Sequence, residues 1–176
     1  YLMMQCAWGF YGQGAALFLN EVYEYGVAGT GAFYAATGLS VAICSLVIQP
    51  YVFKKMQPKN AYIGFAVVCG LSLIATAIFA SIQVQWLIGI VGSATQLICY
   101  TALLTIISSA VSDKEQGKAM GAAGAGFGLA WFLNDIMMGH LVDKSIYAPL
   151  PFGGVMFIVS IFIFIFAMKK FKAHQA

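Results

Sequence analysis

The sequence predicts an all-α membrane protein with six transmembrane helices. Its composition excludes a soluble domain, because 61% of the 176 residues are hydrophobic and only 9% are charged, against about 25% charged residues in soluble proteins. The mean hydropathy is +0.87. Six apolar runs are each long enough to cross a bilayer core, which takes about 20 helical residues. These runs are residues 1–19, 32–53, 61–80, 87–111, 119–142 and 151–168.

The lysine distribution predicts the orientation of these helices. All nine basic residues are lysines, and only Lys144 follows an odd-numbered run. The other eight are Lys54, Lys55, Lys59, Lys114, Lys118, Lys169, Lys170 and Lys172. Since lysine-rich connections stay in the cytoplasm, we expect both termini of this segment to be cytoplasmic. Topology therefore explains the net charge of +3, and we expect no nucleic-acid partner.

The first two runs carry polar residues on one side. In the first run, Gln5 and Gln13 fall with two glycines on one broad side of the helix. In the second run, Thr37, Ser40 and Cys44 follow a three-then-four spacing, which places them on one helical face. Because polar groups at membrane depth find no water on the lipid side, these faces predict contact with protein or with a hydrated cavity.

The third and fourth runs differ from each other in polarity. The third has only Ser72 and Thr76 in its middle, so it can face lipid over most of its circumference. The fourth places Ser93, Gln96 and Tyr100 on one face, again with a three-then-four spacing.

The fifth run carries polar residues and the sixth is apolar all round. Trp131, Asn134 and Asp135 lie in the fifth run, whereas the sixth contains a single hydroxyl, on Ser160. Four helices with polar faces and two without them predict a cavity lined by the first, second, fourth and fifth helices.

Asp135 requires an explanation, because a charge at mid-membrane depth costs about 2.5–3.5 kcal/mol on insertion scales. It shares a helical face with a glycine stripe, which predicts that it faces protein and not lipid. The stripe consists of Gly117, Gly121, Gly124, Gly128 and Gly139. Two interpretations stay open. Asp135 is a packing residue hydrogen-bonded to Asn134 or a tyrosine, or it is a protonatable or ligand-pairing carboxylate in the cavity.

The sequence contains no pattern typical of a metal site or a catalytic site. Four cysteines lie in four different runs without a CxxC pair, and the chain has only two histidines. No nucleophile–base constellation and no HExxH motif is present. We therefore predict no metal, no cofactor and no enzymatic activity.

Two stretches resemble the major facilitator superfamily, most closely its drug–proton antiporter branch. `ISSAVSDKEQGKAMGAAGAGFGLA` is similar to the passage between the tenth and eleventh helices of that family. `GAFYAATGLSVAICSLVIQPYVFKKMQPKNAYIG` is similar to the passage between the eighth and ninth helices, with Lys54 and Lys59 at basic positions of the loop motif. The loop departs from the motif at Gln49 and Met56, which occupy glycine positions.

The resemblance implies that residues 1–176 are the C-terminal half of a twelve-helix transporter fold. Six helices would then form one half, a fragment of a longer chain whose N-terminal six-helix half is its partner. The family's first, second, fourth and fifth helices of this half line the central cavity. Relatives often carry Gly-Pro where this chain has Asn134 and Asp135, so their coupling details do not transfer to this position.

The function that we expect is secondary active transport of a small organic solute by alternating access, coupled to protons. The candidate binding or coupling residues are Gln5, Gln13, Gln96, Tyr100, Trp131, Asn134 and Asp135. We expect a multi-pass protein of the bacterial inner (plasma) membrane, with the lipid bilayer, the solute and protons as partners. The alternative is a six-helix channel or a non-transporting membrane assembly module.

Overall fold

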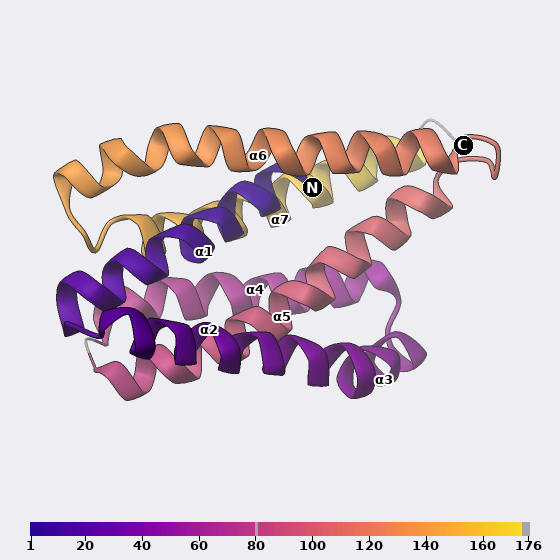
Figure 1. Cartoon of the computed structure of the whole chain (residues 1–176). Helices are drawn as coiled ribbons and strands as arrows, with labels where there is room; N and C mark the ends of the chain where they lie inside the picture. Colours follow the sequence, from indigo (N-terminus) through magenta and orange to yellow (C-terminus); the bar gives the residue numbers. More distant parts are fainter. Residues whose placement is uncertain (80, 174–176) are drawn as a thin grey trace.

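The computed structural model describes residues 1–79 and 81–173, and all secondary structure in this range is helical (Figure 1). The predicted all-α class is therefore confirmed. The elements are α1 (Leu2–Tyr23), α2 (Gly26–Ile43), η1 (Cys44–Ile48), α3 (Gln49–Lys55), α4 (Pro58–Ile78), α5 (Ile82–Ser109), α6 (Gln116–Lys144) and α7 (Pro149–Ala173).

The elements α2, η1 and α3 form one continuous helical rod, Gly26–Lys55. Within it, η1 is a π-helical segment in which the Gln49 N–H bonds to the Cys44 carbonyl. Pro50 follows at once and has no N–H to donate to the preceding turn. The wide turn thus precedes the position where the proline interrupts the α-helical hydrogen bonds.

Several helix ends differ from the apolar runs. The second rod begins at Gly26 and not near residue 32, because three glycines that the sequence pattern assigned to a loop are helical. At the other end of the third run, α4 stops at Ile78, and Phe79 is extended. The predicted end of that run, residue 80, lies outside the described residues.

Four of these helices are long and apolar enough to span a membrane. They are Gly26–Lys55, Pro58–Ile78, Ile82–Ser109 and Pro149–Lys169. The helices α1 and α6 have 22 and 29 residues, so their length suffices, but their polar side chains lower their hydropathy. Six spans therefore stay a prediction.

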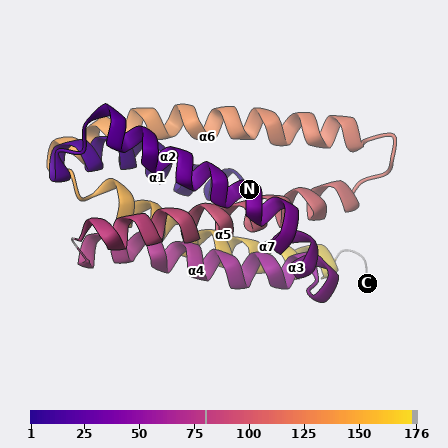
Figure 2. The same ribbon diagram turned by 60° about the horizontal axis from the view of Figure 1, so that its bottom comes forward.

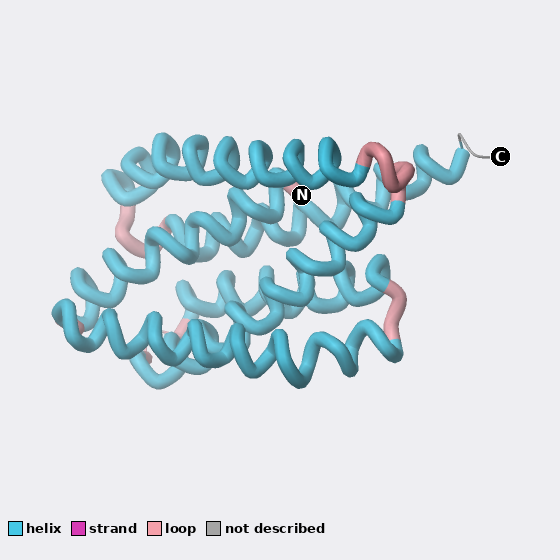
Figure 3. The backbone as a smooth tube through the Cα atoms, turned by 45° about the vertical axis from the view of Figure 1, so that its right-hand side comes forward, coloured by secondary structure: helices cyan, strands magenta, loops and turns pink. Residues whose placement is uncertain are grey.

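The helices pack in a fixed neighbour order. α7 lies between α1 and α4, and α5 packs on both α4 and α2. α6 packs mainly on α1 and has few contacts with α5 and α7, and it lies along one edge of the bundle in Figure 2. Short loops join α1 to α2, α3 to α4, α5 to α6 and α6 to α7 (Figure 3).

All lysine-bearing segments except one meet at the same end of the bundle. The α3–α4 connection, the α5–α6 connection and the end of α7 lie together there, while Lys144 lies at the opposite end (Figure 1). This arrangement is what the positive-inside pattern requires. The side of the membrane to which this end belongs stays a prediction.

Candidate functional site

A cavity of about 330 Å³ lies between α1, α2, α5 and α6. These are the four helices whose polar faces predicted a cavity. Aromatic side chains form much of its wall, with Trp8 and Tyr11 from α1, Tyr34 from α2 and Trp131 from α6. The polar side chains on the wall are Thr37, Ser93 and Gln96, and no charged side chain lines it.

Two donors on this wall have no hydrogen-bond partner among the described residues. They are the Tyr11 hydroxyl and the Trp131 Nε1, both buried. An unpaired buried polar group costs about 1–3 kcal/mol. Both atoms are closed to solvent in this structure, so neither faces the open space of the cavity.

Gly89 on α5 makes room for the buried end of Tyr11. A Cβ at Gly89 would lie 2.7 Å from the Tyr11 hydroxyl and 2.5 Å from Phe33 Cζ. Both distances are shorter than any ordinary contact, so only glycine fits at this position with the neighbours where they are. The glycine thus sets how deeply Tyr11 inserts between α1 and α5.

A hydrogen-bonded cluster joins α1 to α6 beside the cavity. Gln13 donates from its Nε2 to the Asp135 Oδ1 at 2.5 Å. The Oε1 of the same Gln13 amide accepts from the Asn134 Nδ2. One side chain of α1 therefore bonds two consecutive side chains of α6.

Gly9 allows the close approach that this cluster needs. Asn134 is fully buried, and a Cβ at Gly9 would lie 3.1 Å from the Asn134 Cγ. The Asn134 Oδ1 has no partner among the described residues. Asn134 therefore packs tightly against Gly9 of α1, while the neighbouring Asp135 is exposed.

The structure brings five of the seven predicted site residues to this region and places two elsewhere. Gln96 and Trp131 line the cavity, and Gln13, Asn134 and Asp135 form the neighbouring cluster. The remaining two, Gln5 and Tyr100, lie near the start of α1.

Gln5 and Tyr100 both associate with Tyr1. The Gln5 Nε2 donates to the Tyr1 hydroxyl at 2.9 Å, and the Tyr1 and Tyr100 ring centroids are 6.1 Å apart. Tyr100 lines a second cavity of about 250 Å³ that reaches Ala123 and Phe127 of α6. These two residues therefore belong to a different part of the α1–α5–α6 region from the cluster at Gln13.

The structure corrects the interpretation of the glycine stripe on α6. The stripe with Asp135 was expected to face protein. Asp135 does contact α1 through Gln13, but a Cβ at each of the five glycines would meet no described atom within 4 Å. Those glycines are Gly117, Gly121, Gly124, Gly128 and Gly139. The buried face of α6 carries Ala123, Ala130 and Asn134 instead. Small residues permit close packing, but they do not specify which surface packs there.

Sequence reasoning missed Tyr11, Tyr34 and Gly89. Tyr34 donates its hydroxyl to the Gly12 carbonyl at 2.7 Å and so ties α2 to α1 across the cavity wall. Aromatic residues are common on lipid-facing and protein-facing sides alike, so their presence did not mark Tyr11 and Tyr34 as cavity residues. The spacing of Tyr11 next to Gly12 and Gln13 was the only indication available.

Among the described residues, no group of three or more His, Cys, Asp or Glu side chains could hold a metal ion. The four cysteines, Cys6, Cys44, Cys69 and Cys99, are free and buried. The chemistry of the site therefore rests on amides, hydroxyls, aromatic rings and one carboxylate.

Comparison with known proteins identifies the family. A sequence profile of the Major Facilitator Superfamily matches residues 1–134. No curated protein and no solved structure matches the chain. The matched segment contains every residue on the wall of the 330 Å³ cavity and ends at Asn134. The chain belongs to the Major Facilitator Superfamily, a family of membrane transporters.

Proposed function

We propose that the chain takes part in secondary active transport of a small organic solute, by alternating access and with proton coupling. The observation that carries this proposal is the cavity between α1, α2, α5 and α6, with its aromatic wall and the polar side chains of Thr37, Ser93 and Gln96. Transporter sites of this kind lie between helices near the membrane midplane.

The chemistry of the wall favours an organic solute over a bare ion. Four aromatic rings offer apolar faces, and an amide and two hydroxyls offer hydrogen bonds. An inorganic cation needs several oxygen ligands, and no carboxylate lines this cavity. Within this proposal, Gln96 and Trp131 contact the solute.

Asp135 is the coupling group in this proposal. Its carboxylate accepts a hydrogen bond from Gln13, whose other amide atom holds Asn134. Loss of the negative charge on Asp135 would weaken the charge-assisted bond to Gln13 and loosen the contact between α1 and α6. Proton binding would thereby change the shape of the cavity, because α1 and α6 also supply Gly12 and Trp131 to its wall.

The wider setting is also proposed. The chain would be the C-terminal six-helix half of a twelve-helix drug–proton antiporter of a bacterial inner membrane, with both ends of this segment in the cytoplasm. Tyr100 would line the path from the lysine-rich end toward the central cavity, and Gln5 would hold Tyr1 beside it through the bond to the Tyr1 hydroxyl. A channel or a non-transporting assembly module is not favoured, because members of the family are transporters.

The test is flux into proteoliposomes with an imposed pH gradient, using a panel of radiolabelled organic solutes. We expect Asp135→Asn to fold and insert, because asparagine keeps the size of the side chain. Gradient-driven accumulation should be abolished, while downhill exchange of the solute persists. The matched control is Asp143→Asn, which removes an exposed carboxylate from the same helix and should leave flux unchanged.

A packing role for Asp135 predicts a different pattern. In that case Asp135→Asn would transport normally under the gradient, and Asp135→Leu would lower the melting temperature in detergent. Normal gradient-driven flux by a well-folded Asp135→Asn protein would remove Asp135 from the coupling mechanism.

A further inference from the structure

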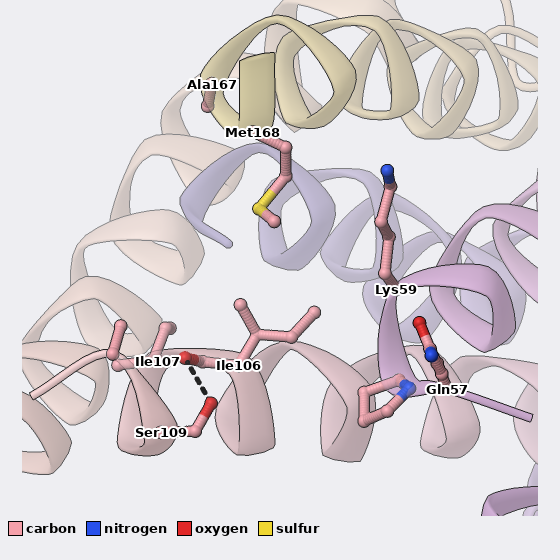
Figure 4. Close-up of a pocket in the computed structure, with 9 residues that line it drawn as sticks. Gln57, Lys59, Ile106, Ile107, Ser109, Ala167 and Met168 are labelled. Atoms are coloured by element: carbon pink, nitrogen blue, oxygen red, sulfur yellow. Dashed lines mark hydrogen bonds between the residues drawn. The ribbon is translucent and has the colours of Figure 1, made fainter. Parts of the chain in front are cut away.

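A separate cavity of about 490 Å³ lies at the lysine-rich end of the bundle, away from the proposed transport site. The start of α4, the end of α5 and the end of α7 enclose it (Figure 4). In Figure 4, Met168 of α7 and Ile106 of α5 face each other across the space. The volume is within the range of about 300–1,000 Å³ that is typical of ligand pockets.

Most of the wall of this cavity is hydrocarbon. Pro58, Ile106, Ile107, Ala167 and Met168 supply apolar surface. A ligand that fills this space must therefore bring an apolar part with it, since burial of such surface is favourable only against apolar atoms.

The polar groups of the wall are few. Lys59 is half-buried, with its aliphatic stem along the wall, as lysines do beside apolar surface. Gln57 adds an amide, and the Ser109 hydroxyl donates to the Ile106 carbonyl at 3.1 Å. The Ser109 oxygen keeps its own capacity to accept a hydrogen bond. The cavity thus combines an apolar interior with a single cationic group.

The charge at this end of the bundle favours an anion. Six lysines whose side chains the structure describes lie in the segments at this end, against two acidic residues, Asp113 and Glu115. Both carboxylates already accept hydrogen bonds within the α5–α6 connection, Asp113 from Gln116 and Glu115 from Ser112. The region around Lys59 therefore has a strong excess of positive charge.

The surroundings of the cavity indicate lipid as the source of the ligand. The helices α4, α5 and α7 are all long and apolar enough to span a membrane. Near the cavity, α7 exposes large apolar side chains, with Phe166 72% and Ile163 49% exposed. Such a surface requires a hydrocarbon environment, so the cavity lies at the boundary between the bilayer core and the lysine-rich end.

We propose that this cavity binds an anionic phospholipid, with one acyl chain against Ile106 and Met168 and the phosphate on the Lys59 ammonium. A soluble phosphate compound would gain nothing from the apolar wall. A zwitterionic lipid would gain less from the excess of lysines, because its headgroup carries no net charge. Basic pockets between transmembrane helices at the cytoplasmic side are suited to anionic headgroups.

The test measures lipid binding to the purified protein in a neutral detergent, by thermal unfolding during titration. The probes are phosphatidylglycerol, phosphatidylcholine with the same acyl chains, and glycerol 3-phosphate without chains. Lys59→Gln removes the proposed phosphate contact, and its matched control is Lys54→Gln, an exposed lysine at the same end that does not line the cavity. Ala167→Phe fills the apolar part and leaves every charge in place.

We expect phosphatidylglycerol to raise the melting temperature more than phosphatidylcholine, and glycerol 3-phosphate to have no effect. Lys59→Gln should weaken phosphatidylglycerol binding about fivefold, the effect of one lysine near an anionic headgroup. Lys54→Gln should leave it unchanged, and Ala167→Phe should weaken the binding of both lipids.

Three results would overturn the proposal. Equal stabilisation by the two lipids would show that the headgroup charge is not recognised. Equal effects of Lys59→Gln and Lys54→Gln would assign the binding to the basic surface as a whole. Unchanged lipid binding by a folded Ala167→Phe protein would show that no acyl chain enters the cavity, and this readout holds even if Lys59→Gln fails to fold.

Discussion

The helices α6 and α7 both carry glycines, but the glycines do different things. In α7, a Cβ at Gly153 would lie 2.6 Å from the Ala7 carbonyl oxygen, and one at Gly154 would lie 2.6 Å from the Gly70 carbonyl oxygen. In α6, a Cβ at Gly121 or other glycines of the stripe would touch no described atom. Gly153 and Gly154 therefore let the backbones of neighbouring helices pack closely, whereas the stripe glycines of α6 contact no described helix.

This difference separates a tightly packed part of the bundle from a loosely held part. The helix α7 contacts α1 at backbone distance through Gly153, and it contacts α4 in the same way through Gly154 and Gly70. By contrast, α6 makes most of its contacts with α1. These include the packing of Asn134 against Gly9 and the hydrogen bond from Gln13 to Asp135. A helix held mainly by polar contacts to one neighbour can move more easily than one locked by backbone contacts.

The largest loss of stability is expected when the glycines of α7 are substituted. Gly153→Ala and Gly154→Ala each place a methyl group against a carbonyl oxygen of the main chain, which cannot rotate away as a side chain can. We expect a loss of stability of about 1–3 kcal/mol or more for each. Thermal unfolding in detergent measures it, with Gly64→Ala as control, because a Cβ at Gly64 meets nothing within 4 Å. A Gly153→Ala protein as stable as Gly64→Ala would refute the packing account.

An intermediate effect is expected at Gly9. A Cβ there would lie 3.1 Å from Asn134 Cγ, so the asparagine must shift by a few tenths of an ångström. We expect Gly9→Ala to cost about 1 kcal/mol, at the low end for overpacked sites, and to reduce transport more than stability, because it displaces α6 at the cluster with Gln13. Transport at wild-type rates with Asn134 displaced would mean that the α1–α6 contact does not control the cavity.

The smallest effect on stability is expected at the α6 stripe. Gly121→Ala and Gly128→Ala introduce no clash, and alanine favours a helix over glycine by about 1 kcal/mol. Stability in detergent should therefore hold or rise slightly. If the stripe meets the proposed N-terminal half, flux should nevertheless fall, because added methyl groups keep the two halves apart. Unchanged flux in both variants would show that this face stays free during transport.

The helices could be predicted from the sequence because long apolar runs leave few other structures in a membrane. The start of the second rod could not, since Gly26, Gly29 and Gly31 disfavour a helix, yet the structure includes all three in α2. The match of the family profile to residues 1–134 confirms the resemblance at the level of the superfamily.

The helices that surround the cavity were predictable, but the orientation of α6 was not. Polar faces on four helices correctly indicated which helices meet around a polar space. Asn134 and Asp135 differ by one position, about 100° around the helix, and sequence periodicity placed Asp135 on the protein-facing side. The structure buries Asn134 against Gly9 of α1, whereas Asp135 is exposed and contacts α1 through its bond with Gln13. The burial of Asn134 depends on Gly9, which lies more than a hundred positions away in the sequence, so no local sequence pattern could predict it.

The most direct test of the account is cysteine labelling of the protein in membranes with a water-soluble maleimide. Gln96→Cys places a thiol on the cavity wall, and Phe162→Cys places one on α7, where the side chain is 68% exposed when no lipid is present. The four native cysteines are buried, so their background reaction should be low. We expect Gln96→Cys to react and Phe162→Cys not to react, because lipid covers the outer face of α7 and water fills the cavity. Labelling of Phe162→Cys as fast as Gln96→Cys would contradict the division into a hydrated cavity and a lipid-facing surface.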